Sequence, residues 1–197
     1  MIQRFSFEEL DLKGSYLIKP FVAHDERGYF IKDYSEEVFI DNGIGHELKE
    51  VFYTSSEKGV IRAIHFQRVK EQAKLVRCLT GKIYDVIVDL RKTSPTYGQW
   101  RGFYLSGETK DSLYIPKNFG HGYLVIEPSI VSYKCSEKFY EEYDDGIKWD
   151  DPELKIKWPL ELVDHNINFS EKDRHLQSFS EFNRKFQAKK RGFEEVK

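Results

Sequence analysis

The sequence has little cysteine and no long apolar run. Its two cysteines, Cys78 and Cys135, form no CxxC pair and no zinc-ligand spacing, and both lie in apolar alternating stretches. We therefore expect buried core thiols in a reduced, cytoplasmic setting. No run of 18 apolar residues exists, so neither a transmembrane helix nor a membrane partner is expected. We expect no secretory signal, because Glu8, Glu9 and Asp11 stand where such a signal needs an apolar core.

Basic charge is not in surplus either. The 197 residues include 31 Lys and Arg against 33 Asp and Glu, which excludes a generally basic nucleic-acid binder but leaves room for a local basic pocket. Hydrophobic residues make up 40%, which is enough for a sizeable core and excludes disorder over most of the chain. The length favours one domain over residues 1–197, with a core from about 15 to 175 and a charged tail from about 186 to 197.

Helix signals are scarce, and only residues 36–42 and 173–185 are typical of helices. Elsewhere, short runs of β-branched and aromatic residues are separated by Gly, Pro, Asn and Asp at intervals of about 8–14 residues, which predicts an antiparallel sandwich or barrel. We therefore predict an all-β fold with a few short helices. The expected strands are residues 15–18, 29–32, 50–56, 60–66, 74–79, 82–89, 99–105, 113–115, 122–126 and 130–135.

Alternation within these strands indicates which side chains share a face. Tyr84, Val86, Val88 and Leu90 form an apolar face, which we predict packs against the opposite sheet. Lys74 shares its face with apolar neighbours. Its amine therefore either points into a cavity or reaches water from an edge strand.

Two histidines stand out by their context, although each alone is more often structural than catalytic. His65 follows an apolar run, and His121 lies between two glycines. Arg62 precedes His65 by three residues, so the two share a face only if the strand bulges between them.

A metal site is the first alternative to consider. The stretch Pro116-x-Asn118-x-x-His121 resembles the second metal motif of cupins, but His65-Phe66-Gln67 supplies only one histidine and no suitable glutamate for the first motif. Two imidazoles without a carboxylate fall short of a facial triad, so we expect no metal. The P-loop, the serine-hydrolase elbow and the dinucleotide-binding glycine pattern are also missing.

The remaining candidates are acid-base groups. A histidine base, a tyrosine acid such as Tyr133 and a nearby lysine together suit proton transfer next to a carbonyl, although a tyrosine in this setting is more often a core residue. The base removes a proton α to the ketone, a cation stabilises the enolate, and the acid returns a proton from the opposite face. Two cations such as Arg27 and Arg62 suit a diphosphate.

Nine segments in this order resemble the RmlC family, the dTDP-4-dehydrorhamnose 3,5-epimerases of the cupin superfamily, from about Val22 to Asp173. Each segment is a weak signal alone, but together they are specific. They are Asp25-Glu-Arg-Gly-Tyr-Phe30, Gly59-Val-Ile-Arg-Ala-Ile-His-Phe-Gln67, Lys74-Leu-Val-Arg77, Gly81 with Asp85-Val-Ile-Val-Asp-Leu-Arg91, Ser94-Pro-Thr-Tyr-Gly98, Ile115-Pro116 with Gly120-His-Gly122, Tyr133-Lys134, Gly146-Ile-Lys-Trp-Asp150 and Ser170-Glu-Lys-Asp173.

The resemblance implies a cupin jelly-roll or barrel, a homodimer without cofactor, and an epimerase acting on a nucleotide-linked 4-keto-6-deoxy sugar in surface-polysaccharide biosynthesis. It implies that His65 is the general base, oriented by Asp173, and that Tyr133 is the general acid, with Lys74 stabilising the enolate. The substrate-binding residues that it implies are Arg27, Arg62, Gln67 and His121.

Four positions depart from the family pattern and alter the expected recognition of substrate. Lys32 and Asp144 each stand where glutamate is usual, and Glu50-Val-Phe52 replaces a Gln-Asp-Asn stretch. We therefore expect a cytidine or guanosine carrier rather than thymidine. Phe139 replaces a second tyrosine, so we hypothesise inversion at C3 alone. Alternatives are a 3,4-ketoisomerase, a non-catalytic sugar-nucleotide-binding cupin and a metal-dependent cupin oxygenase.

Overall fold

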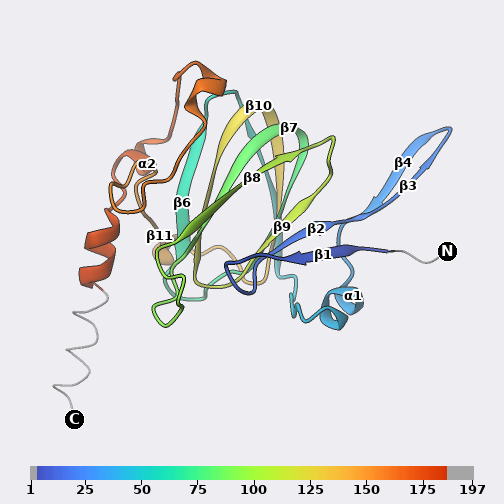
Figure 1. Ribbon diagram of the computed structural model, residues 1–197, viewed down its shortest axis with the longest axis horizontal. Coiled ribbons are helices and arrows are strands. Elements are labelled where there is room, and N and C mark those ends of the chain that lie inside the picture. Colours follow the sequence, from blue (N-terminus) through green and yellow to red (C-terminus); the bar gives the residue numbers. More distant parts are fainter. Residues whose placement is uncertain (1–3, 186–197) are drawn as a thin grey trace, which may run out of the picture.

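The structure, a computed structural model, describes residues 4–185 (Figure 1). The tail expected over residues 186–197 lies outside this range. The helical elements are α1 (Glu36–Asp41), α2 (Glu171–Arg174), η1 (Glu141–Tyr143) and η2 (Leu160–Val163). The strands are β1 (Ser6–Glu9), β2 (Tyr16–Lys19), β3 (Phe21–Asp25), β4 (Gly28–Lys32), β5 (Glu50–Ser56), β6 (Ile61–Gln67), β7 (Lys74–Asp89), β8 (Trp100–Ser106), β9 (Ser112–Ile115), β10 (Phe119–Cys135) and β11 (Asp144–Gly146).

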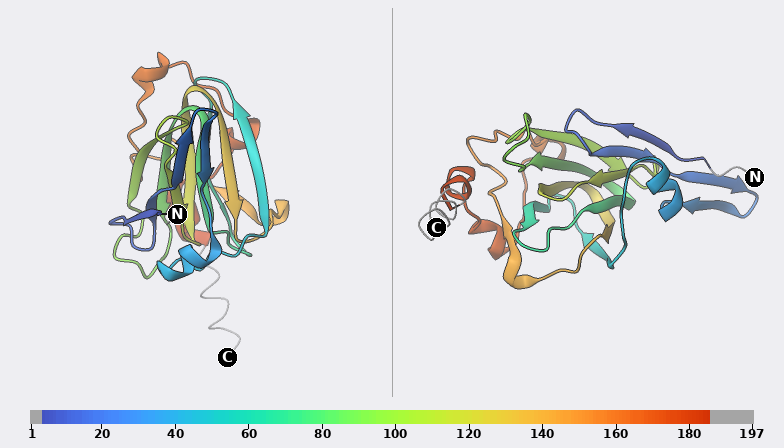
Figure 2. Two further views of the ribbon diagram at one scale, coloured as in Figure 1. Left: turned by 90° about the vertical axis from the view of Figure 1, so that its right-hand side faces the viewer. Right: turned by 90° about the horizontal axis from the view of Figure 1, so that it is seen from below.

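The strands form one large antiparallel sheet and a separate hairpin. The large sheet has nine strands in the order β1-β2-β9-β7-β10-β6-β11, with β5 also paired to β10 and β8 to β7. The sheet curls around its core, while the β3–β4 hairpin projects from one end of the molecule (Figures 1 and 2). The predicted all-β cupin fold is confirmed, and no helix among residues 4–185 is long and apolar enough to cross a membrane.

Two pairs of predicted strands are in fact single long strands. Residues 74–79 and 82–89 both belong to β7, and residues 122–126 and 130–135 both belong to β10. Gly81 lies within β7 at a φ of +73°, and a β-carbon there would approach Pro128 O to 2.1 Å. Glycine therefore allows β7 to continue where the sequence pattern predicts a break between two strands.

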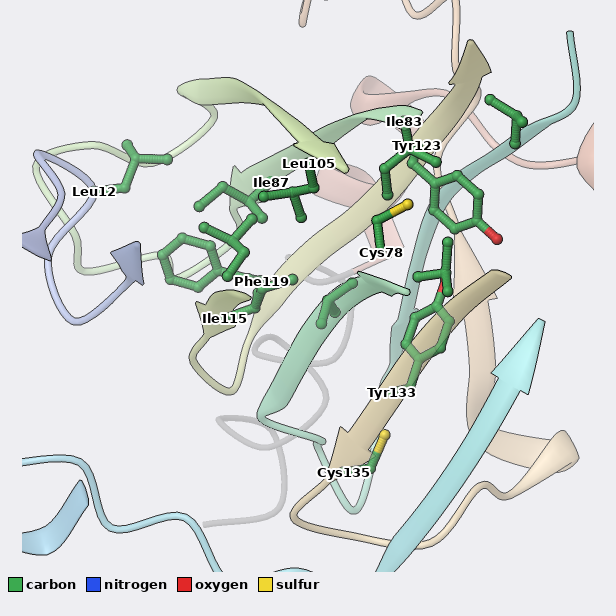
Figure 3. Close-up of a cluster of buried hydrophobic side chains, with 14 residues drawn as sticks. Leu12, Cys78, Ile83, Ile87, Leu105, Ile115, Phe119, Tyr123, Tyr133 and Cys135 are labelled. Atoms are coloured by element: carbon green, nitrogen blue, oxygen red, sulfur yellow. The ribbon is translucent and has the colours of Figure 1, made fainter. Parts of the chain in front are cut away.

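The two faces of β7 pack differently from our prediction. Ile83 and Ile87, which alternate with the predicted face, lie in the core enclosed by the sheet (Figure 3). Val86, Val88 and Leu90 instead pack in a second cluster that the segment from Ile147 to Phe182 completes. The predicted face was wrong because both faces of β7 are buried, so apolar alternation does not distinguish inside from outside.

The C-terminal helix prediction was also wrong in detail. Residues 173–185 do not form one helix, because α2 ends at Arg174 and a new helical segment starts at residue 179. Between them, Gln177 forms a parallel bridge with Ile147, which requires extended backbone. The prediction also missed β1, β3 and β11, whereas both cysteines are buried and free as expected.

The close approach at Gly81 yields a stability prediction. Gly81→Ala places a β-carbon against backbone at a positive φ, so we expect the free energy of unfolding to fall by about 3 kcal/mol in urea titrations. Gly45→Ala is the control, because a β-carbon there meets no atom within 4 Å. Equal stability of the two variants would contradict this account.

Candidate active site

One cavity of about 290 Å³ collects nine of the twelve predicted site residues. Strands β5, β6, β7 and β10 contribute most of its wall, and α2 with the residues around it closes one side. The predicted residues that line it are Arg62, His65, Gln67, Lys74, His121, Tyr133, Phe139, Asp144 and Asp173.

A bulge in β6 explains how Arg62 and His65 both reach this cavity. His121 of β10 pairs with His65, but Tyr123, two residues later, pairs with Arg62, three residues earlier on β6. The additional residue on β6 changes the alternation between these two positions. The bulge required by the sequence argument is therefore present.

His65 and Asp173 form a dyad at the cavity wall. His65 Nε2 lies 2.7 Å from Asp173 Oδ1, and the Asp173 side chain is buried. Ser170, the N-cap of α2, accepts a hydrogen bond from Asp173 N and donates one to Asp173 Oδ2 at 2.9 Å. Burial raises the pKa of Asp173, but His65 and Ser170 outweigh this effect and lower the pKa below its ordinary value.

A second, more deeply buried pair supports the floor of the cavity. His121 Nε2 lies 2.9 Å from Asp85 Oδ2, and both side chains are almost completely excluded from solvent. Asp85 comes from the β7 face that the sequence analysis did not assign to the interior. The pair fixes the orientation of the His121 ring, because a buried carboxylate needs a donor.

Tyr133 is held by aromatic neighbours and retains its proton. Its ring stacks on Phe52 at 4.7 Å between centroids, and the His121 ring meets it edge-on at 5.8 Å. Burial, followed by the neighbouring Tyr123 and Asp85, raises the pKa of Tyr133 well above its ordinary value. A neutral phenol at neutral pH is a proton donor, as general-acid chemistry requires.

Lys74 lines the cavity, which favours the first of the two interpretations of its sequence position. Burial lowers the pKa of Lys74, while the nearby Cys135, Asp144 and Asp85 act in the opposite direction. An ammonium in this position places positive charge next to any oxyanion that forms in the cavity.

Asp144 and Gln67 line the cavity but already have protein partners. Asp144 forms an ion pair with Lys172, a residue of α2 that also lines the cavity. The Gln67 amide donates to Lys70 O and Lys138 O and accepts from Tyr140 N, so it holds the loop that carries Phe139.

Arg27, Lys32 and Glu50 do not line the cavity of this chain, contrary to the sequence prediction. Arg27 lies in the turn of the projecting hairpin, where its guanidinium pairs with Asp25 at 2.6 Å, and Lys32 ends β4. Glu50 lies just behind the wall, where it accepts a hydrogen bond from Phe139 N at 2.9 Å. Arg27 and Lys32 lie outside the cavity because β3 and β4 pair only with each other, and the hairpin that they form extends away from it.

Sequence reasoning missed other parts of the wall. Ser170 and Lys172 flank Asp173 within a segment already noted, and Gln72 precedes Lys74 by two residues, so spacing could have found them. The remaining missed lining residues are Phe52, Thr54 and Phe66, which are ordinary strand residues without a distinguishing signal.

The cavity therefore combines a histidine-carboxylate dyad, a neutral phenol and the amine of the half-buried Lys74. Within residues 4–185, no group of three His, Cys, Asp or Glu side chains could hold a metal ion. The groups that are present can remove a proton from carbon, stabilise an oxyanion and return a proton.

Comparisons with known proteins place this chain in a family. The profile described as dTDP-4-dehydrorhamnose 3,5-epimerase matches residues 9–181. The protein of that name from Methanothermobacter thermautotrophicus is 47% identical over 178 residues, which cover 90% of this chain and 96% of the relative.

Solved structures agree. The dTDP-6-deoxy-D-glucose-3,5-epimerase of Legionella pneumophila, in complex with dTDP-4-keto-L-rhamnose, superimposes with a TM-score of 0.85 at 34% identity, covering 89% of this chain and 93% of that one. A 3'-monoepimerase from Streptomyces bikiniensis in complex with dTDP-quinovose gives 0.81 at 26% identity, covering 90% and 89%. The chain belongs to the dTDP-4-dehydrorhamnose 3,5-epimerase family, a family of isomerases.

Proposed function

We propose that this protein epimerises a nucleotide-linked 4-keto-6-deoxyhexose in the biosynthesis of a rhamnose-like sugar for a surface polysaccharide such as O-antigen. The observation that carries the proposal is the convergence of the His65–Asp173 dyad and Tyr133 on one cavity. All three hydrophobic clusters include strands of the same sheet, which supports a single catalytic domain. The free thiols of Cys78 and Cys135 agree with a cytoplasmic setting.

His65 acts as the base that removes a proton α to the ketone. Its Nε2 faces Asp173, so Nδ1 is the ring nitrogen available to take the proton. The lowered pKa of Asp173 keeps this carboxylate ionised, and its charge stabilises the imidazolium that forms. The C–H bond breaks in this step, and its electron pair moves into the enolate.

Lys74 stabilises the enolate and Tyr133 completes the inversion. Lys74 lines the cavity, and its ammonium stabilises the negative charge that the oxygen of the former ketone gains. Tyr133 lines the same cavity from β10 and gives its proton to the carbon on the face opposite His65. The product is the inverted ketone, and Tyr133 is left as a phenolate.

Inversion is restricted to C3. Phe139 lines the cavity with a ring that carries no hydroxyl, so one proton donor is absent from the wall. The 3'-monoepimerase from Streptomyces bikiniensis shares the fold at a TM-score of 0.81, which supports this restriction.

The carrier is a cytidine or guanosine diphosphate. Asp144 brings carboxylate oxygens to the cavity, and the Glu50 carboxylate lies just behind the wall; both keep lone pairs after their contacts with Lys172 and Phe139 N. Carboxylates accept from the amino groups of cytosine and guanine, whereas thymine has no amino group. Arg62, at the cavity wall, suits the diphosphate.

A homodimer completes the site with the projecting hairpin. Tyr29 and Phe30 on β4 are 53% and 56% exposed, which is costly for a monomer. In the dimer, the hairpin packs on the partner subunit and brings Arg27 and Lys32 to the partner's cavity. This arrangement explains why two predicted site residues lie far from the cavity of their own chain.

Deuterium incorporation tests the chemistry and its selectivity. In deuterated water, we expect the wild type to place deuterium at C3 only, and His65→Asn to lower the rate by at least 100-fold because the base is lost. NMR of the product gives both the position of deuterium and that of the carbonyl. Deuterium at C5 as well would overturn C3 selectivity, and a moved carbonyl would indicate a 3,4-ketoisomerase. Binding without any exchange would indicate a non-catalytic module.

Calorimetry with CDP, GDP, UDP and TDP tests the carrier. We expect CDP or GDP to bind at least tenfold more tightly than TDP, and Asp144→Asn to reduce that preference because an amide accepts less strongly than a carboxylate. Tightest binding of TDP would contradict the proposed carrier.

Sedimentation velocity tests the dimer. The wild type should sediment at twice the chain mass of 23.4 kDa, and Tyr29→Asp/Phe30→Asp should shift it toward monomer because charge replaces the apolar contact. Tyr104→Asp, at an exposed tyrosine of β8, is the matched control. A monomeric wild type would disprove the shared site.

A further inference from the structure

Each inversion leaves two protons out of place. His65 holds one too many and Tyr133 one too few, so the phenolate must regain a proton before the next turnover. Tyr133 lines the cavity but is only 6% exposed, so few water molecules contact it. A buried acid in this position needs a route for proton return, and the question rests on the proposed function.

A second buried tyrosine lies next to Tyr133. Tyr123 is completely buried, and its ring and that of Tyr133 occupy the same core cluster, with their hydroxyls directed to the same region (Figure 3). Tyr123 is also a hydrogen-bonding neighbour that helps to raise the pKa of Tyr133. Its own hydroxyl lies 2.8 Å from Thr54 Oγ1.

Thr54 connects Tyr123 to the cavity. It is only partly buried on β5, pairs with Val131 of β10, and lines the cavity as Tyr133 does, whereas Tyr123 itself does not line it. Three hydroxyls therefore lie in sequence, from Tyr133 through the completely buried Tyr123 to the partly buried Thr54. Phenylalanine would fill the same core volume as Tyr123, so the hydroxyl adds no packing and is costly to bury without a partner.

We propose that Tyr123 is a positioning residue that works with Thr54 as a hydroxyl relay to reprotonate Tyr133. When the Tyr133 O–H bond has broken and the carbon has gained that proton, the phenolate takes the proton of Tyr123. Tyr123 takes the proton of Thr54, and Thr54 takes one from a water molecule in the same concerted movement. The hydroxide that remains is neutralised by the proton that His65 releases, so the cycle closes without net change.

The test compares single-turnover with steady-state kinetics. In Tyr123→Phe, we expect the rate of the first turnover to stay within about twofold of that of the wild type, because His65, Lys74 and Tyr133 start in the protonation states that the reaction needs. The steady-state kcat should fall about tenfold with KM unchanged, and product should appear as a burst of about one equivalent per subunit. Tyr104→Phe removes an exposed hydroxyl and is the matched control.

A double-mutant cycle tests whether the two hydroxyls act together. Thr54→Val should reproduce the burst, and Thr54→Val/Tyr123→Phe should be no slower than the slower single variant, because one missing link already interrupts the relay. If the fold reductions in kcat of the two single variants instead multiply in the double variant, the two hydroxyls act independently and the relay is overturned.

Failure of the relay and failure of the proposed function give different results. A Tyr123→Phe enzyme with the wild-type kcat and no burst overturns the relay alone, as does an equal loss in the first and later turnovers, which would indicate a structural defect. Absence of epimerised product from the wild type overturns the proposed function and the relay with it.

Discussion

The antiparallel pairing of β7 with β10 is the constraint on which the rest of the structure depends. The two strands pair from Phe119 with Asp89 at one end to Cys135 with Lys74 at the other. Together they supply Lys74, Asp85, His121 and Tyr133, so the relative positions of these groups follow from backbone hydrogen bonds rather than from loops. A site built on paired strands holds its geometry more firmly than one built on loops.

The same pairing places polar groups where water is scarce, and several of these groups have a partner within the protein. His121 has Asp85, Asp173 has His65 and Ser170, and Tyr123 has Thr54. Because an unpaired buried polar group is costly, these partners favour one orientation of each side chain. Burial raises the pKa of Tyr133, and the partners of Asp173 lower the pKa of that carboxyl, so one group is protonated and the other is ionised at neutral pH.

Composition and alternation were sufficient to predict the all-β class, and spacing located most of the strands. The inward face of β7 could not be found in this way, because Val86 and Ile87 are equally buried on opposite faces. The continuity of β7 through Gly81 could not be predicted either, because the sequence does not distinguish a glycine that permits a bend from one that ends a strand.

The site was predicted where a motif held a titratable residue, and missed where a partner came from an unremarkable strand. His65 and Asp173 lie more than a hundred residues apart, and only the resemblance to a family joined them. The sequence places Asp85 between Ile83 and Ile87 on one face of its strand, but alternation alone does not predict that its partner is His121. Arg27 was expected at the cavity but lies outside the cavity of its own chain, because the direction of a hairpin depends on tertiary contacts that its own residues do not encode.

The position of α2 near the end of the described chain has a consequence for how the protein matures. Ser170 and Asp173 reach His65 only after the segment from Ile147 onward has packed over β6 and β7. A nascent chain that has emerged only as far as β11 holds most of the sheet but not the carboxylate that orients its imidazole. During synthesis, the imidazole of His65 and the carboxylate of Asp173 can therefore meet only after α2 has left the ribosome.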